Sequence, residues 1–173
     1  MAIPTAPLDG LLFFSFLYHQ DFDFDSFLEN CQKKYGTGAF FKHSFFPMKN
    51  YYEKEMGGPL VRCFFVPHQL YKREELVQAK LWSYEIELKF SHDDIRTINI
   101  DPGMITLENF QLATFKSFSH RIYLTKNVYS DLNLCFTKKG VQSFNWTYPD
   151  YKHPDIIEFI RWNRSVLSQK LIH

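Results

Sequence analysis

Cysteine is scarce in this 173-residue sequence, which contains only Cys31, Cys63 and Cys135. Three widely spaced cysteines exclude a small disulfide scaffold, and no pair of them has the spacing of a zinc site. Each lies in an apolar stretch, so we predict three buried thiols in a reducing compartment.

An excess of charge of one sign is also lacking, since 20 Lys and Arg residues balance 19 Asp and Glu residues to a net charge of +1. Without a polybasic block, the chain has no electrostatic footprint for duplex DNA or for an anionic membrane. The apolar run at 11–18 is too short to cross a bilayer, and no signal-peptide cleavage site follows it. We therefore predict a cytoplasmic protein with no duplex DNA and no membrane as partner. The net charge does not exclude a small anionic ligand, because binding such a ligand needs only a few local cations.

Several catalytic and nucleotide-binding motifs are absent. The sequence contains no G-x-x-x-x-G-K-[ST], no N-K-x-D, no G-x-G-x-x-G, no H-E-x-x-H and no G-x-S-x-G. The fingerprint of RNA-binding RRM domains is missing from the expected central strands. The segment 85–89 matches the E-x-E-x-K pattern of triphosphate-tunnel enzymes, but it lies in helix-patterned sequence, where residues two apart point nearly opposite ways.

Aromatic residues are abundant, with 19 Phe, 10 Tyr and 3 Trp making up 18% of the chain. One interpretation is a core filled with Phe, because each ring buries a large apolar area. The other is an aromatic-lined cleft or a stacking platform. We favour the core, since most large apolar residues lie inside a folded domain.

Hydrophobic periodicity predicts an α+β fold. Strands are predicted at 11–18, 39–46, 60–66 and 97–101. The first predicted helix begins between residues 23 and 26 and ends at residue 36, and the second runs from 72 to 90. A loop is predicted at 48–59 and a turn at 102–103. The second helix is predicted to bury Val77, Leu81, Tyr84 and Leu88. The order βαββαβ is that of a ferredoxin-like core, with two helices on one face of an antiparallel sheet.

Beyond this core, the pattern predicts an antiparallel β-meander and a C-terminal helix. We expect a short helix or strand at 106–115, a hairpin at 119–125 and 128–137, a third strand at 142–148 and a helix at 154–170. The length suits one core, so residues 1–173 are predicted to form a single α+β domain.

The chemically versatile side chains gather in one central segment. Asp101, at a predicted strand end, and His120, whose pKa is ordinarily near neutral, are the candidate catalytic residues for proton transfer. Lys116 and Arg121 are candidates to hold an anionic group. Arg121 and His120 point to opposite faces of a strand, so both reach one ligand only if a bulge or strand end re-aims one of them. The structural alternative for Arg121 is a cross-strand ion pair with Asp131.

Two other segments are candidate cleft walls. Residues 51–58 are long enough to fold over a cleft, with a Gly-Gly pair as a hinge, and residues 146–151 place aromatic rings and Asp around a proline. The alternatives are a solvated connection and a rigid corner before the last helix. The candidate ligand-binding residues are Lys116, Arg121, Tyr129, Asp131, Tyr52, Glu53, Glu55, Trp146, Tyr148 and Asp150. The sequence identifies no cofactor, and no ligand spacing supports a metal site.

The segments YYEKEMG, NIDPGMITLENFQLATFKSFSHRIYL, VYSDL and WTYPDY resemble the signature blocks of the bacterial domain-of-unknown-function family 4416. The resemblance covers most of the chain. It implies no activity, because that family is uncharacterised. Some members carry the label GTP-binding protein, but this chain lacks both nucleotide motifs, so we do not transfer the label.

Two hypotheses about function follow. The first is a cleft around residues 99–131 that binds or transforms a small anionic molecule. The alternative is a non-enzymatic interaction module whose aromatic surface binds a protein partner or single-stranded RNA. A concave pocket with converging charges favours the first, and a flat exposed aromatic patch favours the second. The sequence does not decide whether the chain is an enzyme.

Overall fold

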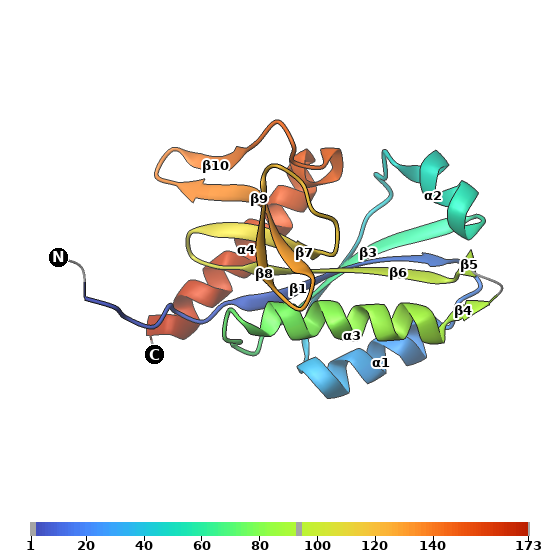
Figure 1. The fold of residues 1–173 in the computed structure, drawn as a ribbon, viewed down its shortest axis with the longest axis horizontal. Helices are drawn as coiled ribbons and strands as arrows, with labels where there is room; N and C mark the ends of the chain where they lie inside the picture. Colours follow the sequence, from blue (N-terminus) through green and yellow to red (C-terminus); the bar gives the residue numbers. More distant parts are fainter. Residues whose placement is uncertain (1–2, 93–94, 173) are drawn as a thin grey trace.

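An eight-stranded antiparallel sheet organises the fold (Figure 1). The structure, a computed structural model, describes residues 3–92 and 95–172, so residues 1, 2, 93, 94 and 173 of the predicted domain lie outside it. In chain order the elements are β1 (Leu11–His19), α1 (Phe24–Tyr35), β2 (Gly38–Lys42), α2 (Lys49–Met56), β3 (Leu60–Pro67), α3 (Glu75–Lys89), β4 (Ser91–His92), β5 (Ile95–Arg96), β6 (Ile98–Ile105), β7 (Asn109–Thr114), β8 (Arg121–Thr125), β9 (Val128–Thr137), β10 (Gly140–Ser143), the 3-10 helix η1 (Pro149–Lys152) and α4 (Pro154–Ile172). The predicted α+β class and C-terminal helix are confirmed.

The strand order of the large sheet is β10-β9-β7-β6-β1-β3-β2, and β8 pairs with β9. The four strands of the predicted core therefore lie in the order β6-β1-β3-β2, each antiparallel to its neighbours. The later strands continue the antiparallel sheet beyond β6. They do not form the predicted meander, because β7 pairs along one edge of β9 while β8 and β10 share its other edge. The short strands β4 and β5 form a separate pair.

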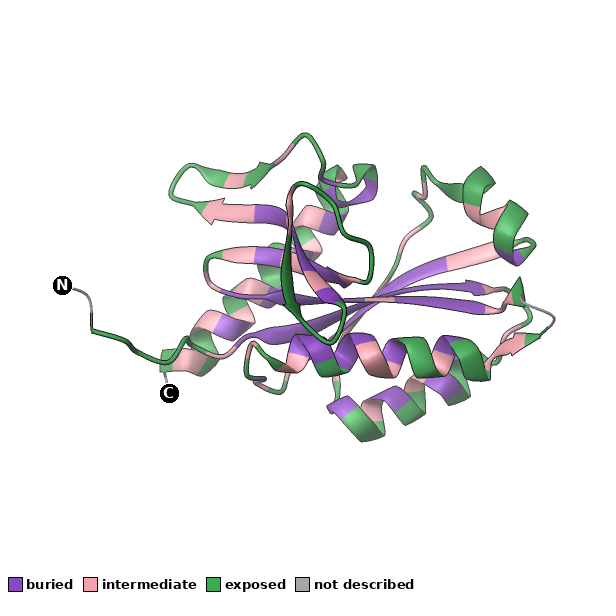
Figure 2. Ribbon diagram, in the orientation of Figure 1, coloured by how far each residue is buried: buried purple, intermediate pink, exposed green. Residues whose placement is uncertain are grey.

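The central strand β1 is buried on both faces, as its uninterrupted apolar run predicts. Phe14 and Phe16 pack in a core with α1 and α3. Leu11 and Phe13 face the other way and pack in a second core with α4. Figure 2 shows the buried residues following the central strands between these two layers of helices. None of the helices in the described part of the chain is both long enough and apolar enough to cross a membrane.

The predicted loop at 48–59 is wrong, because most of it forms α2. Lys49 Nζ lies 3.7 Å from Glu53 Oε1, an ion pair one helical turn apart. Met56 is the buried residue of this helix, and Gly57 ends it with a φ of 76°. Low hydrophobicity predicts a loop here, but a short surface helix needs little apolar surface.

The predicted turn at Pro102 and Gly103 is also wrong, since both residues lie within β6. β6 pairs with β7 only from Gly103 onward, where Gly103 faces Leu112. The Ile100 N–H points away from β1 and is accepted by Glu87 of α3. Pro102, two residues on, faces the same side and has no N–H to donate. The β6–β7 pairing therefore stops at this proline, and a cavity opens between the two strands.

The predicted hairpin is confirmed as β8 and β9, with Arg121 opposite Asp131. The segment predicted as a helix or strand at 106–115 contains the strand β7. A register shift between β7 and β9 leaves Asn133 without an opposing residue. This bulge breaks the predicted alternation along β9, so Asp131, Asn133 and Leu134 are all buried. Only the start of the predicted strand at 142–148 belongs to β10.

Candidate functional site

A cavity of about 360 Å³ lies where β6 and β7 part. Its floor comes from α3 and the first half of β6, its walls from β7, β9 and η1, and its cover from α2 and the loop before it. The volume is within the range of small-molecule sites, roughly 300–1,000 Å³. The lining combines tyrosine rings, carboxylates and cations, so it suits a polar ligand with a flat or apolar part.

The floor is polar because α3 turns Lys80, Ser83 and Glu87 inward, and all three are buried. Glu87 Oε1 accepts the Ile100 N–H at 2.6 Å, and Lys80 Nζ donates to Ile100 O at 3.5 Å. These side chains satisfy backbone groups on the edge of β6 that β7 leaves unpaired. The stop in the β6–β7 pairing thus brings two charged helix residues into the cavity.

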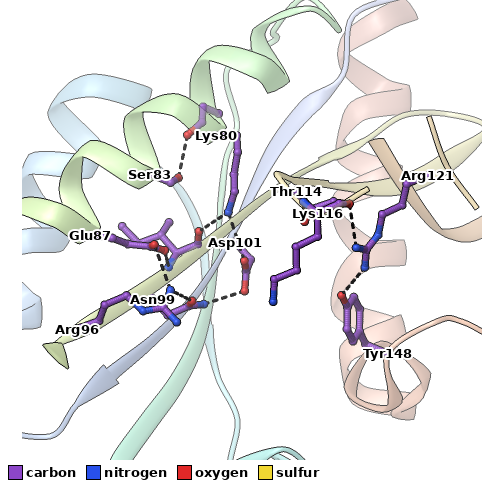
Figure 3. Close-up of polar contacts among 12 residues, drawn as sticks. Lys80, Ser83, Glu87, Arg96, Asn99, Asp101, Thr114, Lys116, Arg121 and Tyr148 are labelled. Atoms are coloured by element: carbon purple, nitrogen blue, oxygen red, sulfur yellow. Dashed lines mark hydrogen bonds and ion pairs between the residues drawn. The ribbon is translucent and has the colours of Figure 1, made fainter. Parts of the chain in front are cut away.

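Asp101 is held in the floor by one hydrogen bond and one ion pair. Asn99 Nδ2 donates to Asp101 Oδ2 at 2.8 Å, and Lys80 Nζ lies 3.6 Å from Asp101 Oδ1 (Figure 3). The Asn99 amide is itself oriented, because its Oδ1 accepts from Arg96 Nη1 at 2.9 Å. The Asp101 side chain remains 36% exposed. It is therefore a fixed acceptor that still faces the cavity.

Arg96 links the cover of the cavity to its floor. Its Nη2 pairs with Glu55 of α2, and its Nη1 lies 3.3 Å from Glu87 Oε2. Burial raises the pKa of Glu87, and the charge of Lys80 and the Ile100 N–H partly offset that rise. The helix α2 is thus tied to the floor by an ion pair.

Arg121 lies behind the wall and is not among the lining residues. Its side chain is 10% exposed, and Nε donates to Asp131 Oδ2 at 2.8 Å. Nη1 donates to Lys116 O at 3.0 Å, and Nη2 to Tyr148 Oη at 3.0 Å (Figure 3). The Asp131 contact is the cross-strand ion pair that sequence analysis left as the alternative. Three of the guanidinium N–H groups are already engaged in hydrogen bonds. The side chain therefore positions Lys116 and Tyr148 rather than offering a pair of unoccupied N–H groups for bidentate binding of a ligand.

His120 also supports the wall from outside the cavity. Its ring stacks on Trp146, with centroids 4.8 Å apart and 12° between the planes. Its Nε2 lies 3.6 Å from Asp131 Oδ1. Strand alternation predicts that His120 and Arg121 point apart, but both reach Asp131, because β8 begins at Arg121 and His120 lies in the preceding turn.

Lys116 is exposed, lines the cavity and extends between Asp101 and Tyr148 (Figure 3). The other lining cations are all in ion pairs, namely Arg62 with Asp150, Lys80 with Asp101, and Arg96 with Glu55 and Glu87. Within residues 3–92 and 95–172, Lys116 makes no ion pair. Its ammonium group is thus the cation of this cavity that is available to an anion.

Tyr52 of α2 and Tyr148 before η1 add aromatic surface to the lining. Burial raises the pKa of both phenols, and the nearby charge of Asp101 adds to the rise in each. Both hydroxyls therefore stay protonated at neutral pH, close enough to Asp101 to be affected by its charge.

The predicted site residues divide into two sets. Those that line the cavity are Asp101, Lys116, Asp131, Tyr52, Glu55, Tyr148 and Asp150, and those that do not are His120, Arg121, Tyr129, Glu53 and Trp146. Glu53 pairs with Lys49 along α2, and Tyr129 packs edge-on against Tyr123 with centroids 5.4 Å apart.

Among the charged and amide-bearing lining residues, sequence analysis did not identify five, namely Arg62, Lys80, Glu87, Arg96 and Asn99. In α3 the predicted apolar stripe is wrong at two positions, since Tyr84 and Leu88 are 48% and 55% exposed. The buried face is rotated toward Lys80 and Glu87. Their spacing of two helical turns was the signal available in the sequence.

A second polar cluster lies outside the cavity, where donor atoms of His43, His153 and Asp155 come within 4.8 Å of one another. Such a set suits a transition metal only if each ring offers a lone pair. His43 Nδ1 accepts the Phe45 N–H at 3.0 Å, and His43 Nε2 lies 3.1 Å from Asp155 Oδ2. A neutral ring that accepts at Nδ1 carries its proton on Nε2, so Nε2 donates to Asp155. The cluster therefore joins the end of β2 to the start of α4.

Comparisons with known proteins bear on the family and not on the site. No curated protein and no solved structure matches the chain. Residues 9–166 match the model of a family described as Domain of unknown function (DUF4416). The match covers most of the chain and confirms the resemblance of the sequence blocks, so this chain belongs to the DUF4416 family.

Proposed function

We propose that this chain binds a small anionic molecule in the cavity between β6 and β7, and that Lys116 contacts the anionic group. The observation that carries the proposal is the state of the lining cations. Lys116 makes no ion pair within the described ranges, whereas Arg62, Lys80 and Arg96 are each neutralised by a carboxylate. A ligand anion that reaches the cavity therefore meets one available ammonium group.

The remaining residues have supporting roles in this proposal. The Lys116 ammonium group, at a distance of about 4 Å from the ligand anion, contributes about 1 kcal/mol in bulk water and about 4 kcal/mol in the partly shielded surroundings of a protein surface. Arg121 holds the Lys116 backbone in place through its hydrogen bond to Lys116 O. Asp101 accepts a hydrogen bond, or a proton, from the ligand, which is the role predicted for it. His120 contacts Asp131 and Trp146 and does not line the cavity, so its proposed role is to support the wall rather than to transfer a proton.

A thermal-shift screen with inorganic phosphate, pyrophosphate, GTP and dicarboxylates tests the proposal. A ligand that binds the native state raises the melting temperature by mass action. We expect one class of anion to stabilise the wild type and to lose this effect in Lys116→Ala. Lys138→Ala removes an exposed lysine between β9 and β10 and is the matched control. A shift that survives in Lys116→Ala, or that disappears in both variants, would contradict the assignment.

The alternative function, a non-enzymatic interaction module, is favoured by one observation. Phe118, Ile122 and Tyr123 are 64%, 71% and 56% exposed on and beside β8. Among the described strands β8 pairs only with β9, so its outer edge is available to an extended partner segment. Fluorescence anisotropy with labelled single-stranded RNA tests the nucleic-acid form of this function. Loss of a co-purifying protein in the variant Ile122→Lys tests the protein-binding form. Neither the addition of RNA nor the Ile122→Lys substitution should alter anion binding.

We also propose that β1, α1, β2, β3, α3 and β6 form a ferredoxin-like core. The strand order β6-β1-β3-β2, antiparallel throughout, supports this, as does the shared packing of α1 and α3 in one core. A cytoplasmic location is proposed on the burial of Cys31 and Cys63 as free thiols. Burial raises the pKa of Cys31 to about 12, so this thiol is unreactive.

A further inference from the structure

We infer that the ligand of this cavity is a small zwitterion, whose anionic group contacts Lys116 and whose ammonium group contacts Asp101. The inference rests on the proposed function and names the class of ligand. It follows from the separation of charge in the lining, from the contacts and exposure of Asp101, and from the tyrosines that line the same cavity.

The lining charges divide into a network with a net negative charge and one positive residue of the wall. The network joins the floor to the cover and consists of two cations, Lys80 and Arg96, and three carboxylates, Glu55, Glu87 and Asp101. It therefore holds one carboxylate more than it has cations. Asp150 and Asp131 are each paired with an arginine, so they add no net charge. Lys116 adds one positive charge from the end of β7. A ligand that matches both zones carries a negative group and a positive group.

Asp101 is the floor carboxylate placed to receive the positive group. Oδ2 accepts one hydrogen bond, from Asn99, and Oδ1 has one ion-pair contact, with Lys80, whereas a carboxylate offers about four acceptor positions. The Lys80 contact is long at 3.6 Å, and the same ammonium group also donates to Ile100 O. Glu87 is engaged by Arg96 and by the Ile100 N–H, and Glu55, although 40% exposed, pairs with Arg96. Asp101 has no arginine partner among the described residues, and its side chain remains 36% exposed.

Aromatic residues of the same lining fit this ligand. Tyr52 and Tyr148 line the cavity together with Asp101. Tyrosine rings in a cavity that also holds a carboxylate are a favourable environment for an ammonium group, because the ring faces attract cations. A second anionic group would instead meet the excess carboxylate of the network. We therefore expect amino acids or phosphorylated amines, and not dicarboxylates or bisphosphates.

Matched probe pairs test the inference in the wild-type protein. O-phosphoethanolamine and propyl phosphate differ by an ammonium group in place of a methyl group, as do 4-aminobutyrate and pentanoate. Isothermal titration should show the amine-bearing member of at least one pair binding roughly tenfold more tightly, a difference of about 1.4 kcal/mol. Equal affinities within both pairs would overturn the inference while leaving anion binding intact. Failure of all four probes to bind would overturn the inference, whereas the proposed function is decided separately by the anion screen with Lys116→Ala.

Asp101→Asn gives a second readout that a general loss of structure cannot produce. Removing the carboxylate should weaken binding of the amine-bearing probe and leave the plain anion unchanged or tighter, because a negative charge has gone. Asp25→Asn changes an exposed carboxylate of α1 and serves as the matched control. If Asp101→Asn weakens both probes of a pair equally while circular dichroism shows a native fold, Asp101 does not read the ammonium group and the inference fails.

Discussion

The buried ion pair between Arg62 and Asp150 predicts a large loss of stability when one partner is removed. The two side chains are 8% and 7% exposed. The Arg62 guanidinium lies 4.9 Å from the Phe46 ring centroid and 5.1 Å from that of Phe64. In Asp150→Ala the guanidinium charge stays buried between two rings without its carboxylate. Removing one partner of such a pair costs about 3–5 kcal/mol.

This cost is a large part of the total stability, which for a folded domain is about 5–15 kcal/mol. A loss of 1 kcal/mol lowers the melting temperature of a domain of this size by about 2–4 °C. We therefore expect Asp150→Ala to melt about 6–20 °C below the wild type. Urea unfolding followed by circular dichroism measures the free energy directly, with an unchanged dependence on urea concentration if the native fold is kept.

The double variant Arg62→Met/Asp150→Leu tests the physical reason for the loss. It removes both charges and leaves apolar side chains, so its stability should approach or exceed that of the wild type. The reasoning is refuted if Asp150→Ala unfolds within about 1 kcal/mol of the wild type, or if the double variant is as unstable as the single one.

Three other changes give separate tests. Arg121→Ala frees the Lys116 backbone and should weaken anion binding severalfold in isothermal titration, with Arg161→Ala, an exposed arginine of α4, as the control. Burial raises the folded-state pKa of Glu87, so ionising this group costs stability as the pH rises. Urea midpoints should therefore show no advantage of Glu87→Gln below a pH of about 4, and a growing advantage as the pH rises through the raised pKa. The two curves staying parallel would contradict this. Gly103→Ala should destabilise the fold by about 1–3 kcal/mol in the same assay, since its Cβ would lie 2.7 Å from Gln111 O; an unchanged midpoint would contradict the close contact.

The elements with a strong local signal were predictable from the sequence. The apolar run of β1 identified a strand covered on both faces, and the alternating segments on either side of Lys126 and Asn127 identified the β8–β9 hairpin. Both residues have positive φ, which suits a tight hairpin turn. In these segments one periodicity dominates, so local pattern and final structure agree.

The floor of the cavity could not be predicted in the same way. The apolar spacing in α3 predicted a buried stripe through Tyr84 and Leu88, whereas the buried face of this helix contains Lys80 and Glu87. These two residues are buried because the edge of β6 needs partners for the Ile100 backbone, and that need arises from a strand pairing that stops at Pro102. Local periodicity contains no information about such a long-range requirement.

The position of α2 over the cavity depends on a contact of the same long-range kind. Glu55 pairs with Arg96, which lies 41 residues further along the chain. Tyr52 and Glu55 were candidates because they sit in a segment long enough to fold over a cleft, and not because their partners were visible in the sequence. The side chains that line the cavity therefore have neighbours that strand pairing determines, and not neighbours in the sequence.

The most direct test of the central claim is the dissociation constant of the best anion from the screen, measured by isothermal titration for the wild type and for Lys116→Ala. Loss of the Lys116 ammonium group should raise that constant at least tenfold, and Lys138→Ala should leave it unchanged. Equal dissociation constants for the wild type and Lys116→Ala would show that Lys116 does not hold the ligand and would contradict the account.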